Sequence, residues 1–310
     1  MANENQNIIG AGQDTARRAP KKETMQNKFI KNYCDGLYNS MDVHFTSACD
    51  NKCHHCIDTR YFGTGIKTPD PKAIAETIIK NQVGYDDVLF LGGEPCLFLD
   101  ALVTCVEKIK ANSNLKLFVT TAIPKICNDK RDLFLYLISM LDGINLSVQH
   151  HSESVADEIR KTISQYNRQE FYNSLPNKEK IRINLNIVKP YLYTKTDISE
   201  CITHYDNMGF SEIKLSEIQH GKDQFVSFEK TFGIKLGSPF YSGCQTFLNT
   251  EDILPNLKVK LLLKRSCFMC EKTLSASLLD GVKACYKIFN PSKNNYGVVY
   301  ENGTLEKGWK

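Results

Sequence analysis

Short blocks of hydrophobic and polar residues alternate along this chain from residue 41 onward. Some blocks are short runs of apolar and β-branched residues, typical of buried strands, and others carry apolar residues three or four positions apart, typical of amphipathic helices. Strands are predicted at residues 41–46, 87–91, 115–121, 144–149, 181–188 and 212–218. Helices are predicted at residues 71–81, 97–110, 130–141, 152–166 and 197–207, with Ser152 as the N-cap of the fourth.

The order of these blocks predicts an α/β fold. Strands that alternate with helices favour a parallel sheet with right-handed crossovers. Six strand–helix units are too few for a closed eight-stranded barrel, so we expect a partial (β/α)6 barrel of the TIM type. By analogy with complete barrels, its site is expected at the C-terminal ends of the strands.

The alternation stops after residue 220 and divides the chain into three predicted parts. Residues 1–32 are rich in Asn, Gln, Ala and Lys and are interpreted as a flexible basic tail, with a polyanion-binding arm as the alternative. Residues 33–220 form the barrel. Residues 221–310 hold four cysteines and the turn signal Asn302-Gly303, of the type I′ kind, and are interpreted as a small cysteine-rich module.

Composition narrows the class of protein. The chain has 310 residues, 42% of them hydrophobic and 24% charged, as in an ordinary globular protein. The net charge is +4, and residues 1–32 hold most of it, with six basic against three acidic side chains. The nearly neutral remainder argues against nucleic acid as a partner. No run of eighteen apolar residues and no secretory signal is visible, so we expect no membrane span and a cytoplasmic location.

Three of the twelve cysteines are closely spaced directly after the first predicted strand. Cys49, Cys53 and Cys56 lie in the run Cys-Asp-Asn-Lys-Cys-His-His-Cys. Three thiolates at this spacing suit a cubane iron–sulfur cluster, which normally takes four, so that one iron is left open to an external ligand. A structural zinc site wants four ligands, and His54 or His55 would have to supply the fourth.

A second motif, Gly92-Gly93-Glu94-Pro95, follows the second predicted strand. The glycines permit unusual backbone angles and the close approach of a ligand. By itself the motif could equally be an ordinary turn between a strand and a helix.

Polar residues stand at the ends of the later predicted strands, where they would face the cleft of the barrel. They are Thr120, Thr121, Ser147, Gln149, Asn186, Ser216 and Glu217. Arg160, in the helix after the fourth strand, could bind a carboxylate through two hydrogen bonds, or form a surface salt bridge instead.

The cysteines of the C-terminal region form another candidate site. Cys267, Cys270 and Cys285 have the spacing Cys-x2-Cys-x14-Cys, with the turn signal Asp280-Gly281 before the last, and Cys244 could complete four ligands. An iron–sulfur cluster and a structural zinc ion both fit such a set, and a role without metal stays open.

The cysteine triad and the Gly-Gly-Glu-Pro motif together resemble the radical S-adenosylmethionine (SAM) superfamily. The resemblance implies a [4Fe-4S] cluster on the triad, with the amine and carboxylate of SAM on the open iron. It implies SAM contacts by Gly92, Gly93, Glu94 and Pro95, and by the polar groups Thr120, Ser147, Gln149 and Arg160. His55 would contact adenine at a position where the family usually has an aromatic residue. The C-terminal cysteines resemble the auxiliary-cluster module of the superfamily, in its SPASM or twitch form, and imply a second cluster.

The resemblance also implies an activity. An enzyme of this kind cleaves SAM reductively to a 5′-deoxyadenosyl radical, which abstracts hydrogen from a substrate, and is oxygen-sensitive. A small molecule or nucleotide is slightly favoured over a peptide, because no peptide-recognition domain is expected before residue 41. Flavodoxin or ferredoxin is the expected electron donor. The alternative from another class is a non-catalytic zinc-binding interaction protein.

Overall fold

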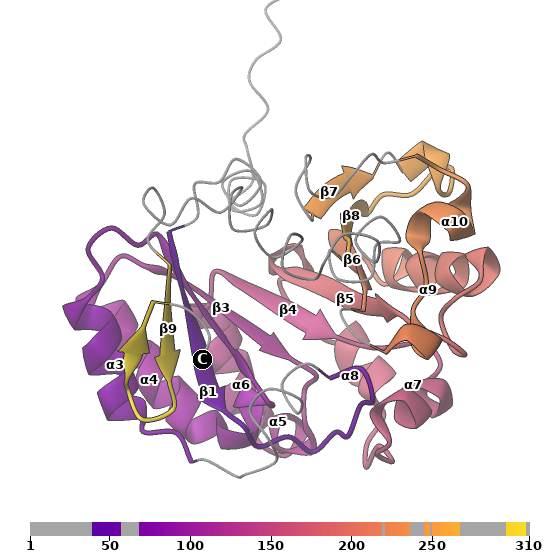
Figure 1. The fold of residues 1–310 in the computed structure, drawn as a ribbon. Helices are drawn as coiled ribbons and strands as arrows, with labels where there is room; N and C mark the ends of the chain where they lie inside the picture. The colour runs from indigo at the N-terminus through magenta and orange to yellow at the C-terminus, as the bar shows by residue number, and fades with distance from the viewer. Residues whose placement is uncertain are drawn as a thin grey trace, which may run out of the picture.

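The structure is a computed structural model that describes residues 39–56, 68–218, 221–235, 245–248, 250–266 and 296–307. Within these ranges the strands form one ten-stranded sheet in the order β10-β9-β1-β2-β3-β4-β5-β6-β8-β7 (Figure 1). The strands are β1 Ser40–Thr46, β2 Asp87–Gly92, β3 Lys116–Thr121, β4 Gly143–Ser147, β5 Ile181–Ile187, β6 Glu212–Glu217, β7 Gln245–Leu248, β8 Lys260–Lys264, β9 Tyr296–Tyr300 and β10 Leu305–Glu306.

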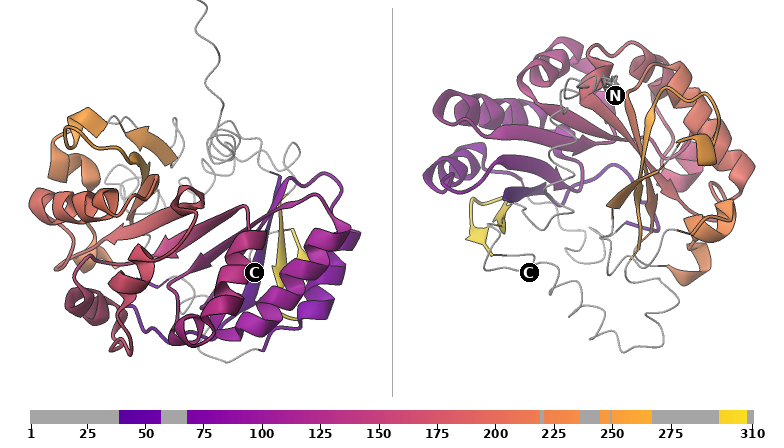
Figure 2. Two further views of the ribbon diagram at one scale, coloured as in Figure 1. Left: turned by 180° about the vertical axis from the view of Figure 1, so that it is seen from behind. Right: turned by 90° about the horizontal axis from the view of Figure 1, so that it is seen from above.

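Helices connect the parallel strands and lie outside the curved sheet (Figure 2). The α-helices are α3 Pro71–Lys80, α4 Leu99–Asn112, α5 Lys125–Asp129, α6 Arg131–Met140, α7 Glu153–Arg160, α8 Arg168–Asn173, α9 Lys195–Asn207 and α10 Phe228–Phe232. The 3-10 helices are η1 Pro95–Phe98, η2 Lys178–Lys180, η3 Lys222–Gln224 and η4 Thr250–Asp252. No helix in the described part of the chain is long and apolar enough to cross a membrane.

The sheet is mostly parallel and stays open. Strands β1 to β6 pair in parallel in chain order, and β9 and β8 extend this parallel set beside β1 and β6. The antiparallel strands β10 and β7 stand at the two ends of the strand order. The α/β class and the partial TIM-type barrel predicted from the sequence are therefore confirmed.

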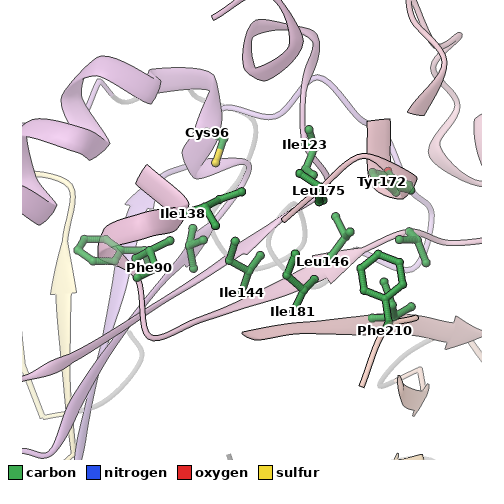
Figure 3. Packing of buried hydrophobic residues seen from close by; sticks show 14 of the residues in the cluster. Phe90, Cys96, Ile123, Ile138, Ile144, Leu146, Tyr172, Leu175, Ile181 and Phe210 are labelled. Atoms are coloured by element: carbon green, nitrogen blue, oxygen red, sulfur yellow. The ribbon is translucent and has the colours of Figure 1, made fainter. Parts of the chain in front are cut away.

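The two faces of the sheet differ in chemistry. Val119, Ile144 and Ile181 share one register row on the outer face and are buried against the helices. Figure 3 shows Ile144, Leu146 and Ile181 among the buried residues of this cluster, together with Ile138 of α6. The next row faces inward and is polar; its members are Thr120, Asn145, Arg182 and Glu212. A helix-covered apolar face and a polar inner face leave the concave side available for a polar ligand.

Two predicted helices differ from the observed ones. The helix expected at 152–166 ends early, at Arg160, because Lys161 adopts the left-handed conformation with φ of 53°; the next helix, α8, begins only at Arg168. Ser152 is at the N-cap position, but its side chain makes no cap hydrogen bond. The helix expected at 97–110 begins instead as the 3-10 turn η1, which Pro95 opens, and continues as α4.

Two strands beyond residue 220 join the barrel sheet. The run Leu261-Leu262-Leu263 forms β8 beside β6, which the sequence pattern did not predict. The hairpin at Asn302-Gly303 is present, and its strand β9 pairs with β1. Strands on both sides of the predicted boundary at residue 220 therefore share one sheet.

The hairpin turn is not of the predicted type I′, because that type needs positive φ at both central residues. Gly303 has φ of +80°, whereas Asn302 is not among the residues with positive φ. Gly303 donates its N–H to the Tyr300 carbonyl at 2.8 Å, so a four-residue turn, residues 300–303, ends in a left-handed glycine. This is a longer hairpin loop than the pair alone indicates.

Candidate active site

The cysteine triad lies on a loop that leaves the C-terminal end of β1. Cys49 is exposed, Cys53 and Cys56 are partly buried, and none of the three is in a disulfide. The loop is held by its backbone: the Cys56 N–H donates to the Cys53 carbonyl at 3.2 Å, and the Asn51 N–H lies 3.4 Å from the Cys49 sulfur. The three sulfurs therefore stand on one short segment at the edge where a barrel carries its ligands.

Gly92 and Gly93 lie directly against the start of this loop. A Cβ atom on Gly93 would lie 2.2 Å from the Ala48 carbonyl oxygen, and one on Gly92 would lie 2.5 Å from that of Thr46. Gly92 also has φ of +125°, which side chains disfavour. The N–H groups of Gly93 and Glu94 donate to Thr46 and Ala48 at 2.7 and 2.8 Å. The glycine pair is needed here because backbone packs on backbone beside the first cysteine.

Glu94 joins the end of β2 to the end of β3. Its carboxylate accepts hydrogen bonds from the Thr121 hydroxyl at 2.7 Å, the Ala122 N–H at 2.7 Å and the Cys96 N–H at 3.1 Å. The side chain is only 2% exposed, and burial raises the pKa of Glu94 to about 7. These three donors fix the carboxylate at the rim of the sheet, within the segment that was predicted to bind SAM.

Arg160 is fully buried, so the predicted surface salt bridge is not what the structure contains. Its Nη2 donates to the Val148 carbonyl at 2.8 Å, and its Nη1 lies 3.4 Å from Glu153 and 3.7 Å from Asp157. The carbonyl of Arg160 accepts from the Lys52 N–H in the cysteine loop at 2.7 Å. Arg160 therefore ties this loop to the end of β4.

Two thiols of the triad, those of Cys49 and Cys53, hold their protons in the metal-free protein. Burial raises the pKa of Cys53 to about 11, although the nearby Arg160 charge lowers it. The pKa of Cys49 is also raised well above the ordinary range, because protein atoms crowd around its sulfur although the residue as a whole is exposed, and the charge of Glu94 adds to the effect. Because a bound metal deprotonates a thiol outright, loading such a site releases protons.

His55 connects the cysteine loop to β5. Its ring is 9% exposed, and its Nε2 lies 3.2 Å from the Asn186 amide nitrogen, a distance at which the amide can donate to the ring. Asn186 pairs in register with Ser216 of β6. The prediction put His55 in the cysteine loop and Asn186 in the fifth strand, and the fold brings the two side chains together.

Several buried polar atoms at this edge have no hydrogen-bond partner among the described residues. They are Ser47 Oγ, Asn51 Oδ1, Gln149 Oε1, Asn184 Oδ1 and Arg160 Nε. Buried polar groups are normally paired, so a cluster of such atoms is suited to binding a polar ligand. Gln149 adds a second sign, since its φ of +68° is uncommon for a residue other than glycine.

The predicted positions Thr120, Thr121 and Ser147 all lie at strand ends. The Thr120 hydroxyl accepts from the Asn145 amide at 3.4 Å, and Ser147 pairs in register with Asn184 of β5. Thr121 is engaged by Glu94. Thr120 and Ser147 belong to inward rows of the sheet, and contacts of either with SAM stay a prediction.

A family model of the radical SAM superfamily matches residues 43–198, half of the chain. This chain belongs to the radical SAM superfamily. It is therefore an enzyme that uses SAM-dependent radical chemistry, and membership implies a [4Fe-4S] cluster and SAM as cofactors. No curated protein matches this radical SAM enzyme.

Solved structures resemble the enzyme in fold. SuiB of Streptococcus suis bound to the precursor peptide SuiA is 14% identical, with a TM-score of 0.57 over 97% of this chain and 68% of that one. The same protein bound to S-adenosylmethionine is 16% identical, with a TM-score of 0.53 over 91% and 62%. A tagged anSMEcpe with AdoMet is 16% identical, with a TM-score of 0.45 over 57% and 50%. This radical SAM chain thus spans about half to two thirds of the solved chains.

The residues of the enzyme fit the cofactors that its family implies. The donor set of three thiols on one loop leaves a cubane cluster one ligand short, which is the opening that SAM needs. The Gln149 and Asn184 oxygens and the Arg160 Nε, which have no partner among the described residues, could bind polar groups of a ligand. The triad would hold the cluster, and these groups would meet SAM or substrate.

Some predicted site residues fall elsewhere. Cys244, Cys267, Cys270 and Cys285 lie outside the described residues of the enzyme. Glu217 accepts the N–H groups of Phe228 and Ser266 at 2.9 and 2.8 Å, so it fastens the segments after β6.

Thr162 was not predicted as a site residue, yet its hydroxyl donates to the Asp50 carbonyl in the cysteine loop at 2.8 Å. A threonine after a helix gives no signal of this kind in the sequence, because its partner lies 112 residues away.

Proposed function

We propose that this enzyme cleaves SAM reductively and abstracts a hydrogen atom from a polar substrate held against the inner face of the open sheet. Support comes from one observation: the cysteine loop, the Gly92-Gly93 turn and the Gln149 segment meet at one edge of a sheet whose inner face is polar. With its cluster and SAM bound, such a site supplies an electron that breaks a carbon–sulfur bond and releases a 5′-deoxyadenosyl radical.

The chain's own residues hold and shield this site. Arg160 and Thr162 fasten the cysteine loop, and Glu94 fixes the rim between β2 and β3. His55 is buried beside Asn186, where an imidazole ring could stack on adenine. Ordered side chains at the reacting edge keep a reactive radical away from water.

The substrate that fits best is a small polar molecule or a nucleotide. The inner rows of β5 and β6 hold a buried ion pair between Arg182 and Glu212 and the unpaired Asn184 oxygen. Hydrogen-bonding groups of this kind orient polar ligands in concave sites.

A peptide is the second candidate. Its support is the fold match to SuiB, whose structure was solved with its precursor peptide SuiA and which matches 97% of this chain. Deuterium transfer separates the two classes: pools of deuterated metabolites and of deuterated peptides are incubated with enzyme and SAM, and the labelled 5′-deoxyadenosine identifies the pool.

We also propose that Cys244, Cys267, Cys270 and Cys285 bind a second [4Fe-4S] cluster, with structural zinc as the alternative. A flavodoxin or ferredoxin would supply electrons. Anaerobic reconstitution should give about eight irons per chain with the second cluster and about four without it. Zinc at the C-terminal set would show as one zinc beside about four irons.

The test of the proposed function is SAM cleavage by anaerobically reconstituted protein with dithionite. Wild-type enzyme should form 5′-deoxyadenosine. Cys53→Ala should lose both the product and the triad's iron, because one thiolate fewer holds the cluster poorly. Cys105→Ala is the matched control, since Cys105 is buried in α4 and belongs to neither predicted ligand set.

Two results would contradict the proposal. One is intact SAM in the presence of a loaded cluster. The other is colourless protein with zinc alone at the triad, which would favour the non-catalytic interaction protein, because zinc has a filled d shell.

A further inference from the structure

A second group of metal-ligating side chains lies apart from the cysteine loop, between the end of β4 and α9. His150 and His151 follow β4, and Cys201 lies in the middle of α9. One ligand atom from each lies within 4.8 Å of the other two. His150 and Cys201 are buried, and His151 is partly buried. We propose that these three residues bind a zinc-class divalent cation that fastens the β4–α7 loop to α9.

The distances are close to those that a tetrahedral ion needs. His151 Nδ1 lies 3.0 Å from the Cys201 sulfur, and the rings of His150 and His151 stack with centroids 4.4 Å apart. Around tetrahedral zinc, an imidazole nitrogen and a thiolate sulfur stand roughly 3.5 Å apart, as the Zn–N and Zn–S bond lengths require. A small opening of the His151–Cys201 pair would therefore admit the ion.

The surroundings supply a fourth ligand and outer support. His204 is one turn after Cys201 on α9, and its ring centroid lies 5.5 Å from that of His151. Its Nε2 lies 3.2 Å from the Gln169 side-chain oxygen, so a proton on Nε2 leaves Nδ1 free to bind metal. The Tyr205 hydroxyl donates to the His150 carbonyl at 3.0 Å and braces the loop. His204 or a water molecule completes four ligands.

The donor set selects the class of metal. Imidazole nitrogens with a single thiolate suit zinc and cobalt, whereas calcium and magnesium prefer oxygen. Binding replaces the proton shared by His151 and Cys201 and releases it to solvent. His150 Nδ1 now accepts the Ser152 N–H at 3.0 Å, and the ring must give up this neutral hydrogen bond, which is weaker than a metal–ligand bond.

An ion bound here would hold the end of β4, at the edge of the active site, in place. The loop that carries the two histidines begins at Val148 and Gln149, directly after Ser147. Val148 accepts from Arg160, and Gln149 has the left-handed backbone and the unpaired oxygen described above. A metal one residue further along would hold Gln149 in this conformation, so the ion acts as a positioning element.

Metal content of the reconstituted enzyme tests the proposal. Cys201→Ser and His151→Ala should each lose one equivalent of zinc per chain, and the double variant should lose no more than one. Cys105→Ala, the matched buried cysteine, should lose none. With cobalt in place of zinc, the thiolate-to-cobalt charge-transfer absorption should fall by one site's share in both Cys201→Ser and His151→Ala, and should stay unchanged in Cys105→Ala. Folded variants with unchanged zinc would overturn the proposal.

A measurement on the wild-type chain keeps the test decisive if the variants fail to fold. Diethyl pyrocarbonate modifies free imidazoles, and His151 is partly exposed. With the iron sites loaded, zinc should slow the modification of His151 several-fold, as followed by mass spectrometry of its peptide. An unchanged rate would sink the proposal. Neither readout needs SAM, so the result does not depend on the proposed radical activity. The zinc affinity of His204→Ala decides whether His204 or a water molecule is the fourth ligand.

Discussion

Replacing Gly93 by alanine tests the close packing between the Gly-Gly turn and the cysteine loop. The added Cβ would lie 2.2 Å from the Ala48 oxygen, 2.7 Å from the Ala48 carbonyl carbon and 2.8 Å from that of Ser47. All three atoms are backbone, so no side chain can rotate away. To restore ordinary contact the two segments must separate by about 1 Å, which also breaks the Glu94 N–H bond to Ala48.

The cost follows from these contacts. Overpacking of a rigid interior costs about 1–3 kcal/mol, and the lost hydrogen bond adds about 1 kcal/mol. The free energy of unfolding should therefore fall by about 2–4 kcal/mol. At about 2–3 °C per kcal/mol for a chain of this length, the melting temperature should drop by about 5–10 °C.

The assay is thermal unfolding of the metal-free protein by circular dichroism, followed by iron analysis after anaerobic reconstitution. Gly93→Ala should melt earlier and retain less iron, because the displaced Ala48 precedes Cys49. Gly209→Ala is the control, since Gly209 has φ of +84° and no atom within 4 Å of its added Cβ. It should cost only about 1 kcal/mol, through backbone strain alone, and keep its iron. A Gly93→Ala protein that behaves like this control would refute the reasoning.

Two further substitutions probe buried charge. Arg160→Lys should lower the free energy of unfolding by about 3 kcal/mol in denaturant titrations and should weaken iron retention. The reason is that an ammonium group cannot make the hydrogen bond to Val148 and both ion pairs at the same time. A variant as stable as the wild type would contradict this. Burial raises the pKa of Asp87 to about 7 from an ordinary 3.8, so the folded state keeps a proton that the unfolded chain releases. The contribution of protonated Asp87 to the free energy of unfolding is therefore fully present below about pH 4, and it is lost as the pH rises through about 7. Asp87→Asn removes the loss, and its stability advantage over wild type should therefore be about 2 kcal/mol larger at pH 8 than at pH 5; an advantage that does not change with pH would contradict the burial argument.

The local pattern of the sequence was sufficient to predict the alternating strands and helices at the centre of the sheet, from β1 to β6. The strands up to residue 218 and most of the longer helices between them were predicted to within a few residues, because alternation and 3.6-residue spacing are properties of neighbouring residues. The short helices α5 and α8 were not predicted. The triad was also visible, since its three ligands occupy eight consecutive residues. The break of the predicted helix at Lys161 was not, because nothing marks a lysine for the left-handed conformation.

Contacts between distant residues were decided only by the tertiary structure. β9 lies beside β1, and Cys201 lies beside His151, across separations that no local period encodes. The same holds for the three donors that converge on Glu94 and for the Arg160 carbonyl bond to Lys52. Sequence spacing can identify ligands that share a loop. Which side chains from different strands and helices come into contact depends on the order of the strands and on packing, and these are determined by the whole chain.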